Sequence, residues 1–225
     1  MIGTLLEASK NPFESTLPFK EATIHYSITG SKKGTQTTYI KDFGKKRVIY
    51  KNCNSKIMNA STSDDSLIMI DTKWTYHINL STKVATKEPS LNNLLIKKFN
   101  TLTEKEQNRI LEKKGKTILG IPSQRESIDG VTHYVSKQGR LLLSSETGIM
   151  GYKVKTIADS IDKRDINDSI FILPKDLKIT EKEADDFKAT QIIKALLKED
   201  DLIVNSDESI DYQTIIQEGI QALDF

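Results

Sequence analysis

The side chains able to do chemistry are few and widely spaced. Three histidines, His25, His77 and His133, lie on three different predicted strands, and the chain has one cysteine, Cys53. A zinc site needs several nitrogen or sulfur ligands in a compact arrangement, and no two histidines here stand at ligand spacing. One cysteine cannot form an intramolecular disulfide. We therefore expect no metal and no cofactor, and an ordinary strand or loop role for Cys53.

Other catalytic motifs are incomplete. The aspartates at 162, 165 and 168 recur every third residue, whereas a calcium loop needs ligands at every second position and a central glycine. Gly-Lys-Thr at 115–117 ends like a phosphate-binding loop, but Ile110 stands where the first glycine is required. Ser144 and Ser145 lack the glycines of a nucleophile elbow. A pair of catalytic carboxylates stays open, because any two can converge, but no motif singles one out. We therefore expect that the protein is not an enzyme.

Apolar side chains at alternate positions are the strongest candidates for a binding surface. Over 74–80, Trp74, Tyr76 and Ile78 alternate with polar residues, as in a strand with one apolar face. Methionine and aromatic side chains adapt well to a flexible acyl chain. The competing interpretation is that such residues form a core closed by helices. The candidate ligand-binding residues are Val48, Tyr50, Leu67, Met69, Trp74, Tyr76, Ile78, Leu141, Leu143, Met150 and Tyr152.

The strands that carry these residues are short and separated by turns. This spacing is typical of an antiparallel meander and not of parallel strands joined by helices. The first set of strands is expected over 21–30, 35–43, 47–51, 66–70 and 74–80. A polar loop is expected over 52–65, in which a further short strand at 56–58 stays open.

Helical spacing replaces alternation after Pro89. Ser90 is the expected N-cap of a helix over 90–99, and a second helix is expected to end near Lys113. These two helices form an insert at about 89–114. A second set of strands is then expected over 125–129, 131–136, 140–144, 149–157 and 170–173.

The C-terminal part differs from the rest in charge and pattern. Residues 181–225 contain 12 acidic residues and four lysines, a net charge of −8, whereas residues 1–180 contain 29 basic and 19 acidic residues, a net charge of +10. Thr180 with Glu183 fits a capping box, and helical spacing recurs over 192–197 and 212–223. The sequence therefore predicts a main domain over 1–180 and an acidic helical appendage over 181–225.

Several stretches together resemble the periplasmic lipoprotein-carrier family, which includes outer-membrane lipoprotein-sorting proteins. They are YIKDFGKKRVIY at 39–50, IMIDTKWTYHINLSTKVATK at 68–87, ESIDGVTHYVS at 126–136 and SIFILPKDLKI at 169–179. The resemblance spans roughly residues 20–180. It implies an open antiparallel half-barrel whose concave face is covered by helices. The acidic appendage and the lack of a cysteine near Met1 depart from the family pattern.

The expected fold class is therefore α+β: an open antiparallel β half-barrel covered by helices, with a helical C-terminal appendage. The resemblance implies non-enzymatic binding of a lipid or lipoprotein acyl chain in the concave face, by a carrier or sensor of the periplasm or outer membrane. The alternative is a protein-interaction module of the cell envelope with a filled core.

Location and other partners are less constrained by the sequence. Residues 1–6 show no basic segment followed by an apolar core, so a cytoplasmic location stays open. We expect no transmembrane segment, because no run approaches the roughly 20 apolar residues of a membrane span. We also expect no nucleic-acid partner, because the lysines at 97–98 and 113–116 belong to no recognised binding module.

Overall fold

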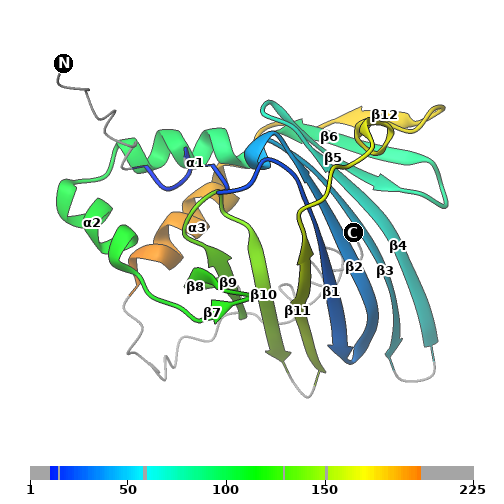
Figure 1. The fold of residues 1–225 in the computed structure, drawn as a ribbon, viewed down its shortest axis with the longest axis horizontal. Helices are drawn as coiled ribbons and strands as arrows, with labels where there is room; N and C mark the ends of the chain where they lie inside the picture. The colour runs from blue at the N-terminus through cyan, green and yellow to red at the C-terminus, as the bar shows by residue number, and fades with distance from the viewer. Residues whose placement is uncertain (1–10, 15, 58–59, 129, 150–151, 199–225) are drawn as a thin grey trace.

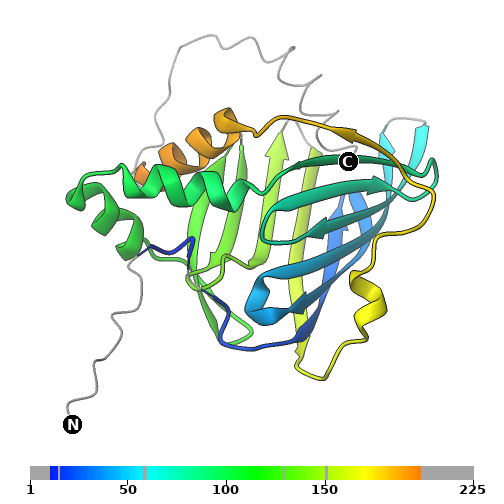
Figure 2. The same ribbon diagram turned by 90° about the horizontal axis from the view of Figure 1, so that it is seen from above.

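A computed structural model describes residues 11–14, 16–57, 60–128, 130–149 and 152–198. Within these residues, one curled sheet of 12 strands is flanked at one end by three α-helices (Figures 1 and 2). Neighbouring strands are antiparallel, except that β12 runs parallel to β6. The strand order is β12-β6-β5-β4-β3-β2-β1-β11-β10-β9-β8-β7.

The chain forms the sheet in two meanders separated by helices. The first six strands are β1 (Ala22–Gly30), β2 (Lys32–Lys41), β3 (Lys46–Ile57), β4 (Ala60–Ile70), β5 (Trp74–Asn79) and β6 (Val84–Pro89). The others are β7 (Thr117–Ile118), β8 (Ile121–Ile128), β9 (Val131–Ser136), β10 (Leu142–Ile149), β11 (Tyr152–Asp162) and β12 (Lys178–Glu181). The helices are α1 (Leu91–Asn100), α2 (Glu104–Glu112) and α3 (Asp186–Leu197), with 3-10 turns η1 (Asp42–Gly44) and η2 (Asp168–Phe171).

Strand register divides the side chains of the sheet between two faces. Ile24 of β1 lies opposite Thr38 of β2, which lies opposite Ile49 of β3. These three share the face toward which the helices lie, here called the helix-side face. Val48 and Tyr50 flank Ile49 in sequence and therefore point to the other face, here called the outer face.

The helices form a core of their own at one end of the sheet. α1, α2 and α3 bring together Leu95, Phe99, Ile110 and Ile192, and the N-terminal segment adds Phe13. The rings of Phe13 and Phe99 meet edge to face, with 5.9 Å between centroids. α3 is therefore packed into the main body.

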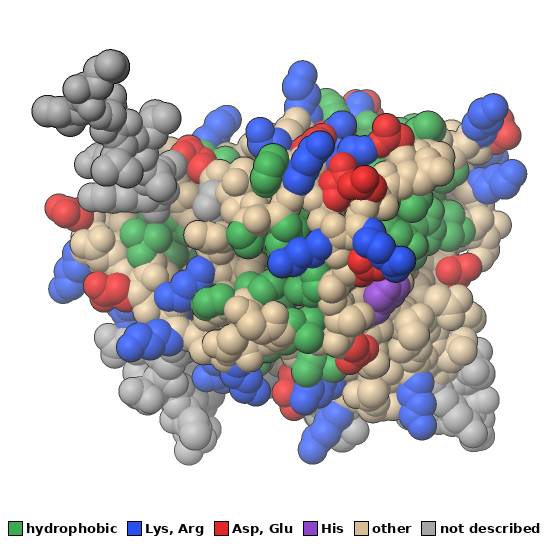
Figure 3. Space-filling view, viewed as in Figure 1, with side chains coloured by type: hydrophobic (Ala, Val, Ile, Leu, Met, Phe, Trp, Pro, Cys, Tyr) green, Lys and Arg blue, Asp and Glu red, His purple; other side chains and the backbone are tan. Residues whose placement is uncertain are grey.

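A segment after β11 covers the outer face. Residues 168–177, here called the strap, lie against β3, β4 and β5 (Figure 1). Figure 3, in the same view, shows hydrophobic side chains between charged groups on this side of the molecule. The strap contributes Ile170, Phe171, Leu173 and Leu177 to a cluster with Val48, Leu67, Met69, Ile78 and Ala85.

The expected fold class is confirmed, and several details are corrected. The strand expected at 170–173 is wrong: residues 168–171 form η2, whose first turn is closed by the Asn167 side chain accepting the N–H of Ser169. Thr180 does not cap a helix but lies in β12. α3 begins after Asp185 instead, whose carboxylate accepts the N–H of Lys188 at 2.7 Å. The helix expected at 212–223 lies outside the described residues.

Candidate functional site

A cleft of about 460 Å³ opens where α1 and α3 meet the ends of β3, β4 and β5 on the helix-side face. It combines an apolar wall with a polar rim. The apolar wall is formed by Phe13, Phe43, Ile70, Leu91, Leu95, Ile96 and Ile192. The polar side chains include Arg47, Asp71, Thr72, Thr75, Ser90, Asn92, Asn93 and Arg140.

The start of α1 is tied to the turn between β4 and β5. The backbone N–H of Ser90 donates to the carbonyl of Lys73 at 2.8 Å, and the Asn93 side-chain amide donates to the carbonyl of Thr72 at 3.1 Å. Within the turn, the Asp71 carboxylate accepts the N–H of Lys73 at 2.6 Å. These bonds fix one rim of the cleft, so the distance between helix and sheet is set locally.

Arg47 enters the cleft from β3 and is held by backbone carbonyls. Its Nε donates to Gly44 and its Nη1 to Arg140, both at 2.9 Å, and Nη2 donates to Gly139. Burial lowers the pKa of Arg47 to about 10, which leaves the guanidinium protonated at neutral pH. Its charge therefore fastens the turn at 139–140 to the sheet.

A buried ion pair lies beside this turn. Arg140 donates from Nη1 and Nη2 to the two oxygens of Glu126 at 2.5 and 2.8 Å, and Gln124 adds a bond at 3.1 Å. Burial alone would raise the pKa of the Glu126 carboxyl, but the charge and hydrogen bonds of Arg140 hold it below its usual value. Burial, with Arg140 nearby, lowers the pKa of His133, although Glu126 opposes this. The pair therefore joins β8 to the turn at 139–140.

Phe43 stands at the mouth of the cleft on a turn of unusual conformation. Asp42, Phe43 and Gly44 have φ of 53°, 58° and 92°, and left-handed backbone costs a non-glycine residue about 1–2 kcal/mol. The N–H of Phe43 donates to the carbonyl of Lys20 at 3.0 Å, and its carbonyl accepts the N–H of Leu17 at 2.9 Å. The ring stays 46% exposed. The fold thus holds an aromatic ring at this opening despite a backbone cost.

The helix-side face continues beyond the cleft along the strands, and this part of the face is here called the trough. Because side chains alternate between the two faces, the trough includes every second residue of β3 after Arg47 and every second residue of β4 before Ile70. It reaches β1, β2 and β11 through the register of those strands. The trough consists of Ile28, Lys32, Ile49, Lys51, Cys53, Ser55, Ser66, Ile68, Tyr152 and Val154.

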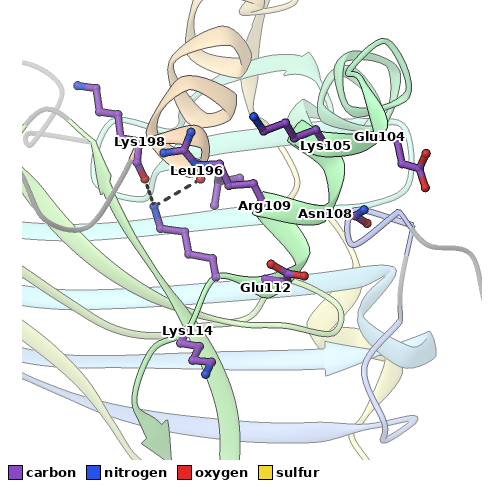
Figure 4. Close-up of a pocket in the computed structure, with 9 residues that line it drawn as sticks. Glu104, Lys105, Asn108, Arg109, Glu112, Lys114, Leu196 and Lys198 are labelled. Atoms are coloured by element: carbon purple, nitrogen blue, oxygen red, sulfur yellow. Dashed lines mark hydrogen bonds between the residues drawn. The ribbon is translucent and has the colours of Figure 1, made fainter.

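A second pocket, a groove of about 910 Å³, lies between α2 and the end of α3. Figure 4 shows the cationic groups of Lys105, Arg109 and Lys198 on the same side of it. Nζ of Lys113 donates to the carbonyls of Leu196 and Lys198, at 3.4 and 3.1 Å. The groove carries five cationic side chains and two carboxylates: Lys105, Arg109, Lys113, Lys114 and Lys198 with Glu104 and Glu112. We call it the cationic groove.

Seven of the predicted ligand-binding residues lie on the outer face. Register places Val48 beside Met69 and Tyr50 beside Leu67, and the strap covers this cluster. The expectation that the whole set shares one concave face is therefore wrong. Alternation shows which residues lie on the same face of a strand, but it does not show which face turns inward. Their role in ligand binding stays a prediction. The seven are Val48, Tyr50, Leu67, Met69, Trp74, Tyr76 and Ile78.

The other predicted residues are distributed differently. Leu141 and Leu143 are buried in the central cluster with Ile24. Tyr152 lies on the trough, and Met150 lies outside the described residues. The cleft itself is lined by none of these described candidates. The sequence offered one pointer to the cleft, the helical spacing of Leu91 and Leu95 in α1.

The three histidines are dispersed. His25 lies on the outer face of β1, His77 faces Glu88 at 3.1 Å, and His133 lies near Glu126. In the described part of the chain, no group of three or more His, Cys, Asp or Glu side chains could hold a metal ion. None of the helices described there is long and apolar enough to cross a membrane.

Comparison with known proteins identifies no family for this chain. No family model matches the sequence, and neither does any curated protein. Similar solved structures include an uncharacterized conserved protein from Thermus thermophilus, with a TM-score of 0.43, 10% identity and coverage of 73% of this chain and 92% of that one. LprF from Mycobacterium bovis gives a TM-score of 0.28, 6% identity and coverage of 70% and 90%. A LolA superfamily protein from Nitrosomonas europaea gives a TM-score of 0.24 and 12% identity, with coverage of 73% of this chain and 95% of that one. At these TM-scores the likenesses carry no argument about fold or function.

Proposed function

We propose that the protein binds an amphipathic ligand with an apolar chain, a lipid or the acyl chain of a lipoprotein, and acts as a carrier or sensor without catalysing a reaction. The observation that supports this most is the cleft of about 460 Å³ between the helices and the sheet. Its volume lies within the usual range of about 300–1,000 Å³ for ligand sites.

The two linings of the cleft suit the two ends of such a ligand. An apolar chain against Leu95, Ile96 and Ile192 would gain about 0.8 kcal/mol for each buried methylene. A polar head would meet the Asn92 and Asn93 side chains at the rim. We place this activity in the periplasm or at the outer membrane, as the resemblance implies.

A protein-interaction role is the second candidate, and exposed apolar side chains favour it. Ile172 of the strap is 69% exposed, Phe187 of α3 72% and Ile179 of β12 47%. β12 is also the edge of the sheet, where a partner strand can add. This role would use the outer face and the edge, and would leave the cleft without a ligand.

Filling the cleft tests the proposal. Ile96→Trp places a large side chain in the cleft, whereas Lys97→Trp adds the same side chain at an exposed position of the same helix. We expect Ile96→Trp to weaken binding of a dansyl-labelled fatty acid by about tenfold or more, a loss of about 1.4 kcal/mol, and Lys97→Trp to leave it unchanged.

Mass spectrometry of solvent extracts from the purified protein provides a second measurement. We expect a co-purifying lipid in the unmodified protein and less of it in Ile96→Trp. A protein that carries no lipid and does not bind the fluorescent fatty acid would rule out this function and favour the interaction role.

A further inference from the structure

One positive charge at the cleft has no carboxylate beside it among the described residues. The Arg47 guanidinium donates to three neutral acceptors, the backbone carbonyls of Gly44, Gly139 and Arg140. In the ion pairs of the described part of the chain, Arg140 has the carboxylate of Glu126, whereas Arg47 has none. Arg47 is only partly exposed, and it lines the cleft. The cleft therefore contains a cation that lacks a counter-charge.

The surroundings of Arg47 favour a negatively charged neighbour. Burial, with the like charge of Arg140 nearby, lowers the pKa of Arg47 to about 10, although Tyr26 opposes this. The guanidinium therefore stays protonated at neutral pH. A charge removed from water is costly unless it is paired, and hydrogen bonds to a charged partner are roughly twice as strong as those between neutral groups. An anion in the cleft would supply the missing partner.

The guanidinium also has hydrogen-bonding capacity left. An arginine carries five N–H donors, and three of those of Arg47 have partners among the described residues. The two others match the number that one carboxylate or phosphate group accepts in a bidentate contact. The three carbonyls hold the side chain in one orientation, so an anion would meet a preorganised donor.

The acidic groups at the cleft leave this preference in place. The charged residues of its lining are three cations and two carboxylates: Lys45, Arg47 and Arg140 with Glu14 and Asp71. Asp71 accepts two backbone N–H groups of the turn between β4 and β5. Glu14 is exposed, so solvent and salt screen its charge. The lining therefore has a net charge of +1.

We propose that the ligand of the cleft is an acidic amphiphile whose carboxylate or phosphate head is bound by the Arg47 guanidinium, an assignment that rests on the proposed function and narrows its ligand class. The apolar wall at Leu95, Ile96 and Ile192 would take the chain. The amides at the rim would contact the rest of a polar head, whereas Arg47 selects for its charge.

Three ligands that differ only in the head group test this assignment on the full chain. Decanoic acid and decyl phosphate carry the two anionic heads, and decanol carries a neutral one. Calorimetric titration at neutral pH measures the affinity of each. We expect at least one anion to bind about tenfold or more tightly than decanol, a difference of about 1.4 kcal/mol. The tighter of the two anions identifies the head as carboxylate or phosphate.

Two variants show whether Arg47 causes the preference. Arg47→Gln removes the charge, and we expect it to abolish the preference for the anion while decanol binds as before. Lys46→Gln removes the same charge from the preceding residue, which points to the outer face and pairs with Asp42 at 3.1 Å. This control should keep the preference. A preference that survives in Arg47→Gln, or is lost equally in Lys46→Gln, would overturn the assignment.

The bound head group gives a second measurement, which needs no variant and decides if circular dichroism shows Arg47→Gln to be unfolded. NMR of the isotope-labelled carboxyl carbon of decanoic acid, or of the phosphorus of decyl phosphate, reports the pKa of the bound head. A guanidinium nearby favours the ionised form, so we expect this pKa to lie below that of the free ligand. A raised pKa would mean that the head lies in apolar surroundings away from Arg47, and would overturn the assignment.

The titrations also separate this assignment from the proposed function. If decanol binds in the cleft as tightly as both anions, the protein binds amphipathic ligands without selecting their charge, and only the assignment to Arg47 fails. If none of the three ligands binds, the proposed function fails together with it.

Discussion

Among single residues, Glu126 and Arg140 depend on each other most strongly. Arg140→Gln would leave the Glu126 carboxylate buried without its counter-charge, and removing one member of a buried pair costs about 3–5 kcal/mol. We expect the double variant Glu126→Gln with Arg140→Gln to cost clearly less than the sum of the single variants. Urea unfolding of the four proteins measures this, and strictly additive losses would contradict the coupling.

His133 should make stability depend on pH. Its pKa is lowered in the folded protein, mainly by burial, whereas in the unfolded chain it lies near its ordinary value of about 6.5. The unfolded state therefore binds more protons below that value, so the contribution of His133 is complete above about pH 6.5 and is lost as the pH falls. Thermal unfolding between pH 7 and 5 should show a shallower slope for His133→Gln than for the unmodified protein. His25→Gln, on the outer face, is the control. An equal change of the slope in both variants would mean that His133 does not cause this pH dependence.

Among the elements, the strap offers the clearest comparison of neighbouring residues. Phe171 packs against the outer-face cluster, with Lys41 Nζ 5.9 Å from its ring centre, whereas the next residue, Ile172, is 69% exposed. Phe171→Ala should lower the free energy of unfolding by about 1–3 kcal/mol, because its ring is only partly buried. Ile172→Ala should stay within about 0.5 kcal/mol. Chemical denaturation measures both, and similar effects would mean that the strap does not protect this face.

The strap and the β3–β4 hairpin also show where sequence prediction ends. Alternation predicted β1, β5 and β9 well, and helical spacing predicted α1 and α2. The polar run at 52–65 was expected to be a loop with at most a short strand at 56–58. Residues 52–57 and 60–65 instead extend β3 and β4, because pairing between the strands satisfies their backbones whatever the side chains. The cleft depends on how α1 and α3 meet the sheet, and no local pattern in the sequence contains that tertiary arrangement.

For the whole molecule, α3 contributes buried residues to the core that the three helices share. Ile192, Ile193 and Leu196 are buried in the helix core, and burying each stabilises the fold by about 1.5–3 kcal/mol. We expect a chain ending at Lys198 to unfold cooperatively, and a chain ending at Glu183 to lose at least about 5 kcal/mol, comparable to a typical total stability. Calorimetry of both chains tests this. Equal stability would support a domain boundary at residue 180 instead.

The pairing of β1 with β11 has a consequence for how the chain comes to be folded during synthesis. Thr23 lies opposite Asp162, so β1 leaves the ribosome long before its second neighbour exists. Until β11 is made, the first meander exposes β1 as an unpaired edge, the kind of surface on which nascent chains associate wrongly. Closing such a distant contact is also slow. The protein should therefore depend on chaperones more than its size suggests.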